Sequence, residues 1–195
     1  KTILSSKTPL IYAGQGVLYS GASQELQELA ELTNIPVTTT MAGKGSIDER
    51  HALSLGSSSV VMNGAVLHYM KTSDTILAVG TSLTKHGMVT TIPDGKKIIH
   101  ITNDPIDIGN YYQPDDALQG DAKLVIRQLI EACSDLLSTR DRPESPANQI
   151  REIKSAWSKS WEKKLTSKES PMTPYRVINE FMKATDPSQN IVTHD

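Results

Sequence analysis

The sequence TPLIYAGQGVLYSG, residues 8–21, indicates the fold most directly. The apolar run Pro9–Ala13 predicts a short strand, the turn Gly14-Gln15-Gly16 follows it, and a helix is expected next with Ser20 as its N-cap. A strand, a Gly-x-Gly turn and a helix N-terminus form a corner that suits an anion, because free N–H groups point into it. The dinucleotide fingerprint has a third glycine where this chain has Tyr19. The motif therefore leaves open both a nucleotide corner and a plain tight turn.

Composition excludes several classes of function. The 195 residues carry a net charge of −2 and a pI near 6.2, so no nucleic-acid or anionic-membrane partner is expected. The only cysteine, Cys133, cannot form an internal disulfide, which fits a reducing, cytoplasmic setting. No apolar run approaches the roughly 18 residues of a membrane span, and no secretory leader is visible. The chain begins at Lys1 and stops at Asp195 as an excerpt would, so a fragment of a longer polypeptide is expected.

Strand and helix patterns alternate through the first two thirds of the chain. Strands are predicted at 9–13, 36–39, 75–79, 97–102 and near 117–118, with helices over about 21–33, 61–71 and 121–137 and a loop over 41–55. Such alternation predicts an α/β fold with a doubly wound parallel sheet, Rossmann-like in type. In these sheets ligands lie beyond the C-terminal ends of the strands. Here those ends are Gly14–Gly16, Thr40–Ala42, Gly80–Leu83, Thr102–Asp104 and Gly120–Ala122.

The composition changes after residue 137. Residues 138–148 are polar and rich in proline, which is typical of a linker. An amphipathic helix is expected over about 147–167, and its tryptophans, Trp157 and Trp161, are expected to pack on protein and not on a ligand. Thr173 and Pro174 predict the start of a further helix, and residues 190–193 look like the first strand of another α/β unit.

Several blocks of the sequence, taken together, resemble one family. The matching blocks are PLIYAGQGVLYSGA (9–22), IPVTTTMAGKGSIDERHALSLG (35–56), DTILAVGTSL (74–83) with KIIHITNDPIDIG (97–109), and ALQGDAKLVIRQL (117–129). They resemble the central domain of thiamine-diphosphate (ThDP) enzymes of the acetolactate synthase, pyruvate oxidase and 2-oxo acid decarboxylase group. Residues 171–195 resemble the opening of that family's diphosphate-binding domain. The expected division is a Rossmann-like central domain at 1–137, a linker with an amphipathic helix at 138–170, and a truncated diphosphate-binding domain at 171–195.

The resemblance implies where the chemistry lies. In the family, a glutamate of the pyrimidine-binding domain activates ThDP, and a Gly-Asp-Gly…Asn motif of the diphosphate-binding domain holds Mg²⁺. Both are expected outside this chain, so no catalytic or metal-ligating residue is assigned in it and the fragment alone is expected to be inactive. Gly120-Asp121-Ala122 with Asn148 mimics the metal motif, but Ala122 stands where glycine is required. The implied partners are the sister pyrimidine- and diphosphate-binding domains, in a homo-oligomer.

The resemblance also implies a candidate nucleotide site, because some relatives hold FAD or ADP in the central domain and others leave it empty. An empty structural domain is expected ahead of FAD or ADP here. Flavin-binding relatives differ from this chain at 55–59 and 82–86, and Thr102 replaces an Asp that would grip a ribose. A stand-alone nucleotide-binding module and a purely structural scaffold are the alternatives. The matching positions are Gly14, Gly16, Thr40, Met41, Ala42, Gly80, Thr81, Ser82, Thr102, Asn103, Asp104, Asp121 and Ala122.

The histidines show no metal-ligand spacing with one another or with cysteine. His100 alternates with isoleucines inside a predicted strand, which favours a hydrogen-bonded core role. His194 and Asp195 are expected near the ThDP diphosphate of the full enzyme, and Cys133 is expected to be an inert packing thiol.

Overall fold

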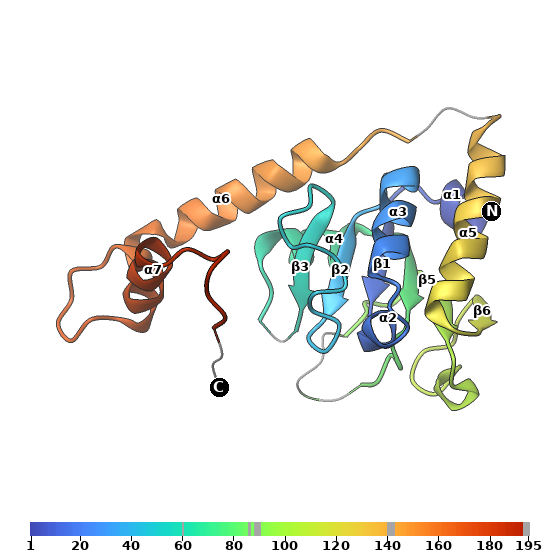
Figure 1. Ribbon diagram of the computed structural model, residues 1–195, viewed down its shortest axis with the longest axis horizontal. Coiled ribbons are helices and arrows are strands. Elements are labelled where there is room, and N and C mark those ends of the chain that lie inside the picture. The colour runs from blue at the N-terminus through green and yellow to red at the C-terminus, as the bar shows by residue number, and fades with distance from the viewer. Residues whose placement is uncertain (60, 86, 88–90, 140–142, 193–195) are drawn as a thin grey trace. The chain divides into compact units, whose positions relative to one another are not determined.

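The computed structural model describes residues 1–59, 61–85, 87, 91–139 and 143–192. The chain forms two compact units, Lys1–Ile153 and Lys154–Asp195, and each is described by itself (Figure 1). His86, His194 and Asp195, which the sequence analysis considered, lie outside the described residues.

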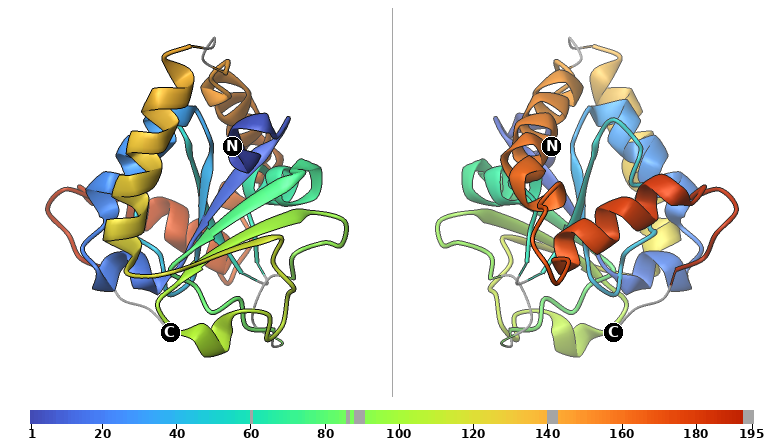
Figure 2. Two further views of the ribbon diagram at one scale, coloured as in Figure 1. Left: turned by 90° about the vertical axis from the view of Figure 1, so that its right-hand side faces the viewer. Right: turned by 90° about the vertical axis from the view of Figure 1, so that its left-hand side faces the viewer.

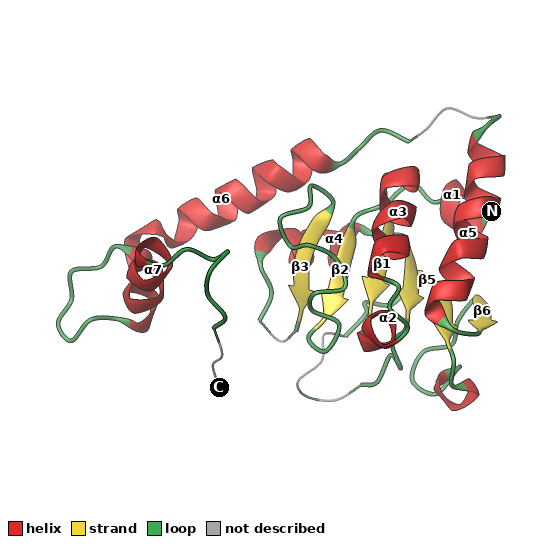
Figure 3. Cartoon of the chain, in the orientation of Figure 1, coloured by secondary structure: helices red, strands yellow, loops and turns green. Residues whose placement is uncertain are grey.

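The first unit is built on one parallel sheet (Figure 3). Its strands lie in the order β3-β2-β1-β4-β5-β6, and every neighbouring pair is parallel. The winding reverses between β1 and β4, so these adjacent strands form the switch point at which ligands bind in such folds. The strands are β1 (Pro9–Ala13), β2 (Val37–Thr40), β3 (Ser54–Ser58), β4 (Thr75–Val79), β5 (Lys97–Thr102) and β6 (Asp116–Gln119).

Helices cover both faces of the sheet, which confirms the doubly wound α/β fold. α3 (Ser23–Thr33) and α5 (Ala122–Leu137) lie side by side on one face, and α4 (Gly64–Thr72) lies on the other (Figure 2). The first turns of α6 (Ala147–Leu165) join the same unit, where Ile150 is buried and the Tyr69 hydroxyl donates to Gln149 at 2.7 Å. Short helices α1 (Thr2–Ser5), α2 (Gln15–Tyr19) and η1 (Pro105–Asp107) complete the unit.

The core follows from the apolar strand runs. β4 is buried along its whole length, and β1 and β5 are each buried except at their first residue. This pattern fits strands that have helices on both sides. Capping side chains set several helix starts: Asn63 accepts the amide of Val66, and Asp121 accepts those of Lys123 and Leu124. Asn34, with φ of 55°, ends α3 in the left-handed conformation that asparagine tolerates.

Two local predictions were wrong. Ser20 is not an N-cap: it ends α2, and its hydroxyl donates to the carbonyls of Gly16 and Val17, so the expected single helix is two helices. The predicted loop over 41–55 runs into β3, which the sequence analysis missed. The run SLGSS has a glycine at its centre and few β-branched residues, but β2 supplies the pairing that its own propensity lacks.

The second unit contains the rest of α6 and α7 (Pro174–Ala184), which begins as predicted, with Thr173 accepting the Arg176 amide and Pro174 in the first turn. Trp161 contacts Trp157 and Tyr175, with ring centroids 5.9 and 5.5 Å away. Residues 190–192 form no strand, since a strand needs a pairing neighbour. In the described part of the chain, no helix is long and apolar enough to span a membrane.

Candidate functional site

The loops after β1 and β4 touch at the switch point. The Gly14 amide donates to Val79, and the Gly16 amide donates to Gly80, each at 2.8 Å. A Cβ added to Gly14 would lie 2.3 Å from the Gly80 oxygen, and one added to Gly16 would lie 2.8 Å from the Gly80 Cα. Gly80 itself has φ of +59°. The glycines are therefore required for the close approach of two backbones.

This packing engages the amides of the predicted anion corner. In addition to the Gly14 and Gly16 bonds, the Val17 amide donates to the Gly14 carbonyl at 3.2 Å. α2 is only five residues long and its N-cap makes no side-chain hydrogen bond. These contacts match the tight-turn alternative of the sequence analysis, and they leave few amides that could bind an anion.

A cavity of about 430 Å³ opens beside this crossing. Of the predicted site residues, it brings together Gly16, Thr40, Met41, Ala42, Gly80, Thr81, Ser82, Thr102 and Asn103, while Gly14, Asp104, Asp121 and Ala122 are not among its lining residues. Its volume lies within the range of about 300–1,000 Å³ that is usual for small-molecule sites. The remaining wall comes from residues that were not predicted as site residues: Tyr12, Gln15, Tyr19, Ser58, Leu83, Thr84, Ile92, Asp107 and Tyr112.

Two threonine hydroxyls of the strand-end loops accept backbone amides. Thr40 Oγ1 accepts the Gly43 amide at 2.9 Å, and Thr81 Oγ1 accepts the Leu83 amide at 3.2 Å. Because a hydroxyl has one hydrogen in addition to its acceptor sites, each can still donate to a ligand. His100 is fully buried, and its Nε2–H donates to the Thr81 carbonyl at 2.8 Å. The predicted core role of His100 is thus to fix the loop that carries Thr81.

Two tyrosines form walls that the sequence did not reveal. Tyr12 is 2% exposed, and its hydroxyl makes no hydrogen bond of ordinary geometry to the described residues. Burial raises the pKa of Tyr12, and the neighbouring Ser58 hydroxyl offsets part of that rise. Tyr112 accepts the Ile92 amide at 3.0 Å, and the Lys85 ammonium lies 4.1 Å from its ring centroid. Tyr12 stands within the apolar run of β1 and is part of the core, so nothing in the sequence marks it as a residue that also lines the cavity.

Comparison with known proteins identifies the family of this chain. Residues 1–129 match the family described as "Thiamine pyrophosphate enzyme, central domain". The chain belongs to this family. It is similar to the "Probable acetolactate synthase large subunit" of Methanococcus aeolicus, at 35% identity over 95% of this chain and 32% of the relative. It is also similar to the acetolactate synthase large subunit of Cyanidium caldarium, at 30% identity over 93% of this chain and 31% of the relative.

A solved structure agrees with this assignment. A protein of Mycobacterium smegmatis described as a thiamin diphosphate-dependent enzyme has a TM-score of 0.59 at 26% identity, over 74% of this chain and 28% of that one. The α/β sheet of the first unit is thus the fold of a thiamine pyrophosphate enzyme central domain. The chain spans about a third of the length of the curated relatives that it matches.

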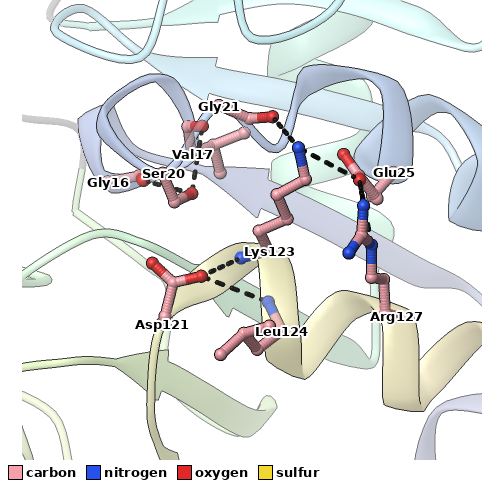
Figure 4. A network of polar contacts seen from close by, with 9 residues as sticks. All are labelled: Gly16, Val17, Ser20, Gly21, Glu25, Asp121, Lys123, Leu124 and Arg127. Carbon is pink, nitrogen blue, oxygen red and sulfur yellow. Dashed lines mark hydrogen bonds and ion pairs between the residues drawn. The ribbon is translucent and has the colours of Figure 1, made fainter.

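The two aspartates of the predicted site that do not line the cavity, Asp121 and Asp104, serve as helix caps. Asp121 Oδ1 accepts the Lys123 amide at 3.0 Å and the Leu124 amide at 3.2 Å (Figure 4). Asp104 accepts the Ile106 amide at 2.9 Å. Within the described ranges, no three His, Cys, Asp or Glu side chains gather as a metal site would require. The described residues therefore do not fit as ligands of the Mg²⁺ that holds the diphosphate of ThDP.

An ionic cluster joins the two helices that cover one face of the central domain. Glu25 of α3 is 7% exposed, and its Oε1 lies 2.9 Å from Arg127 Nη2 and 3.4 Å from Lys123 Nζ (Figure 4). The same Lys123 ammonium donates to the Gly21 carbonyl at 3.1 Å. The cluster links the first turns of α5 to the junction between α2 and α3.

Proposed function

We propose that this central domain works inside an enzyme that depends on ThDP and Mg²⁺ and that joins or cleaves a carbon–carbon bond of a 2-oxo acid. The family membership and the two relatives named acetolactate synthase large subunits support the proposal. When bound, ThDP supplies a carbanion-stabilising centre for such reactions. The single observation that carries the proposal is the match of residues 1–129 to the family's central domain.

The role proposed for this chain is non-catalytic. Asp121 and Asp104 at the strand ends cap helices and do not line the cavity, and Asp107 is the one carboxylate among its described lining residues. The catalytic glutamate and the metal motif would come from sister pyrimidine- and diphosphate-binding domains. The proposed boundaries are 1–137 for the central domain, 138–170 for the linker and 171–195 for the start of the diphosphate-binding domain.

We further propose that the parent enzyme is a cytoplasmic homo-oligomer. A single buried cysteine is compatible with a reducing compartment. The second unit exposes apolar side chains along α7, including Val177, Ile178 and Phe181, at fractions of 44–57%. Such a surface is typical of a helix that is covered by other domains or subunits.

Reading the natural gene on both sides of residues 1–195 tests the proposal. A pyrimidine-binding domain with its glutamate is expected upstream, and a Gly-Asp-Gly metal motif is expected downstream. A gene that encodes neither would refute the proposed activity. A biochemical test uses the 195-residue chain: ThDP with Mg²⁺ should leave its melting temperature unchanged, whereas a clear increase would place the cofactor site in this chain and refute the non-catalytic role.

A further inference from the structure

We propose that the cavity at the switch point binds an uncharged aromatic ligand that carries hydrogen-bond acceptors, and that it discriminates against nucleoside diphosphates. The proposal concerns a ligand of the central domain itself and does not depend on the reaction of the parent enzyme. It differs both from the empty structural domain that was expected from the sequence and from the alternative of a bound FAD or ADP. Three features of the cavity carry it: the walls, the free donors and the charge.

The walls suit a flat apolar body. Met41, Leu83 and Ile92 supply aliphatic surface, and Tyr19 and Tyr112 supply aromatic surface at the same cavity. Tyr19 is 80% exposed although it is a large aromatic side chain. Aromatic rings pack favourably against other rings in offset or edge-to-face arrangements, which makes an aromatic ligand a good match for these walls.

Two hydroxyl groups of the cavity wall can still donate a hydrogen bond. Thr40 and Thr81 each accept a backbone amide and so keep their own hydroxyl hydrogen for a ligand. The ligand should therefore carry carbonyl oxygens or unprotonated ring nitrogens.

The charge of the cavity opposes phosphate. Strong phosphate sites use Arg, Lys or free backbone amides. None of the described lining residues is Lys or Arg, and the amides of Gly14, Gly16 and Val17 already donate to carbonyls. The lining includes a carboxylate, Asp107, which would repel an anion.

Two neighbouring groups could weaken this argument, and neither does. Lys85 is near the cavity, but its ammonium lies over the Tyr112 ring and the residue does not line the cavity. Thr102 occupies the position at which a carboxylate would grip a ribose. Its hydroxyl accepts the Asp104 amide at 3.2 Å and donates to Asp107 at 3.3 Å, so its hydrogen is already used. Among the described residues of the cavity, a nucleotide would therefore find no strong partner for its phosphates or for its ribose.

Matched probes test the discrimination on the 195-residue chain. Riboflavin is compared with FAD, and adenosine with ADP, by calorimetric titration, because each pair shares its ring system and differs in phosphate. We expect at least one of riboflavin and adenosine to bind, at least about tenfold more tightly than its phosphorylated counterpart. Failure of both uncharged probes to bind, or equal or tighter binding of FAD or ADP, would overturn the proposal.

Variants with matched controls identify the groups responsible. Asp107→Asn should strengthen binding of the phosphorylated probe by roughly three- to tenfold, whereas Asp135→Asn, which makes the same change of charge on the far end of α5, should not. If Lys85→Gln selectively abolished ADP binding, a phosphate contact would exist and the proposal would be wrong.

Discussion

The carbonyl oxygen of Gly80 accepts the amide of Gly16 at 2.8 Å. This bond joins the loop after β1 to the loop after β4, the two strands between which the winding of the sheet reverses. Backbone meets backbone here, with no side chain between them. The position of the cavity is therefore set by how closely two loops approach, and this approach is sensitive to a single methyl group.

Gly14→Ala should destabilise the first unit. Its Cβ would lie 2.3 Å from the Gly80 oxygen and 2.5 Å from Thr81 Cβ, so the loops must separate. Overpacking of this kind costs about 1–3 kcal/mol or more. Urea denaturation should show the loss as a lower midpoint. Gly87→Ala is the control, since no atom of the described residues lies within 4 Å of a Cβ at that position. Equal stability of the two variants would contradict the proposed role of the close approach.

Removing charge from the Glu25 cluster should lower stability in a non-additive way. Glu25→Gln and Lys123→Met each remove the charge pair between Glu25 and Lys123, so the double variant should lose less than the sum of the two single losses. Thermal unfolding of all four proteins closes this double-mutant cycle. Glu28→Gln, at an exposed position of the same helix, is the control and should have little effect. Strict additivity would show that the ion pair contributes no coupling.

The same carboxylate predicts part of the acid sensitivity. Burial tends to raise the pKa of Glu25, but its own backbone amide, Arg127 and Lys123 together hold that pKa below its ordinary value of 4.5. A lowered pKa stabilises the fold above the unfolded-state pKa, and this contribution is lost as pH falls through the folded-state pKa. Glu25→Gln should therefore flatten the fall of melting temperature below about pH 4.5. An unchanged pH profile in Glu25→Gln would contradict this.

Asp74 should give the larger acid effect. Burial pushes its pKa up, but the Ser6 hydroxyl and the amides of Lys7 and Thr8 lower that pKa to about 2, against an ordinary value of 3.8. The carboxylate therefore contributes about 2 kcal/mol above pH 4, which is lost as pH falls towards 2. Denaturation at several pH values should show this loss in the natural chain and its absence in Asp74→Asn. Asp135→Asn, which retains Asp74, should follow the natural chain.

Cys133 should react slowly in the folded protein. It is 4% exposed on α5, and burial raises the pKa of its thiol, so little reactive thiolate forms. Labelling by a thiol reagent at pH 8 should be on the order of 100-fold slower in the native chain than in urea. Comparable rates in both conditions would show that α5 opens readily or that the thiol is accessible.

The reliability of the sequence predictions followed the strength of local signals. β4 and β5 were predicted with their observed bounds, because Thr75–Val79 and Lys97–Thr102 are continuous apolar runs with polar or glycine ends. The helix expected over about 121–137 and the helix start at Thr173 and Pro174 were also right. β3 was missed because its residues carry no strand pattern of their own, and its pairing with β2 is a contact between distant segments.

The residues that line the cavity likewise divide into those with a local sequence signal and those without one. Loop residues such as Thr40 and Thr81 were predicted because parallel strands bring their C-terminal ends to one edge. Tyr112 was not, because it lies well after β5 along the chain and reaches the cavity through its bond with Ile92. No local pattern marks such a residue.

The sequence by itself determined the parallel α/β architecture and the strand-end loops that surround the cavity, since periodicity and turn residues act over a few neighbouring positions, and the resemblance of whole sequence blocks indicated the family. Only the tertiary structure decided that the amides of the Gly14–Gly16 turn donate to backbone carbonyls and not to a ligand. It also decided that Tyr12 and Asp107 line one cavity and that Glu25 pairs with α5. These features depend on distances between segments far apart in the chain, which packing of the whole sheet fixes and local preference does not.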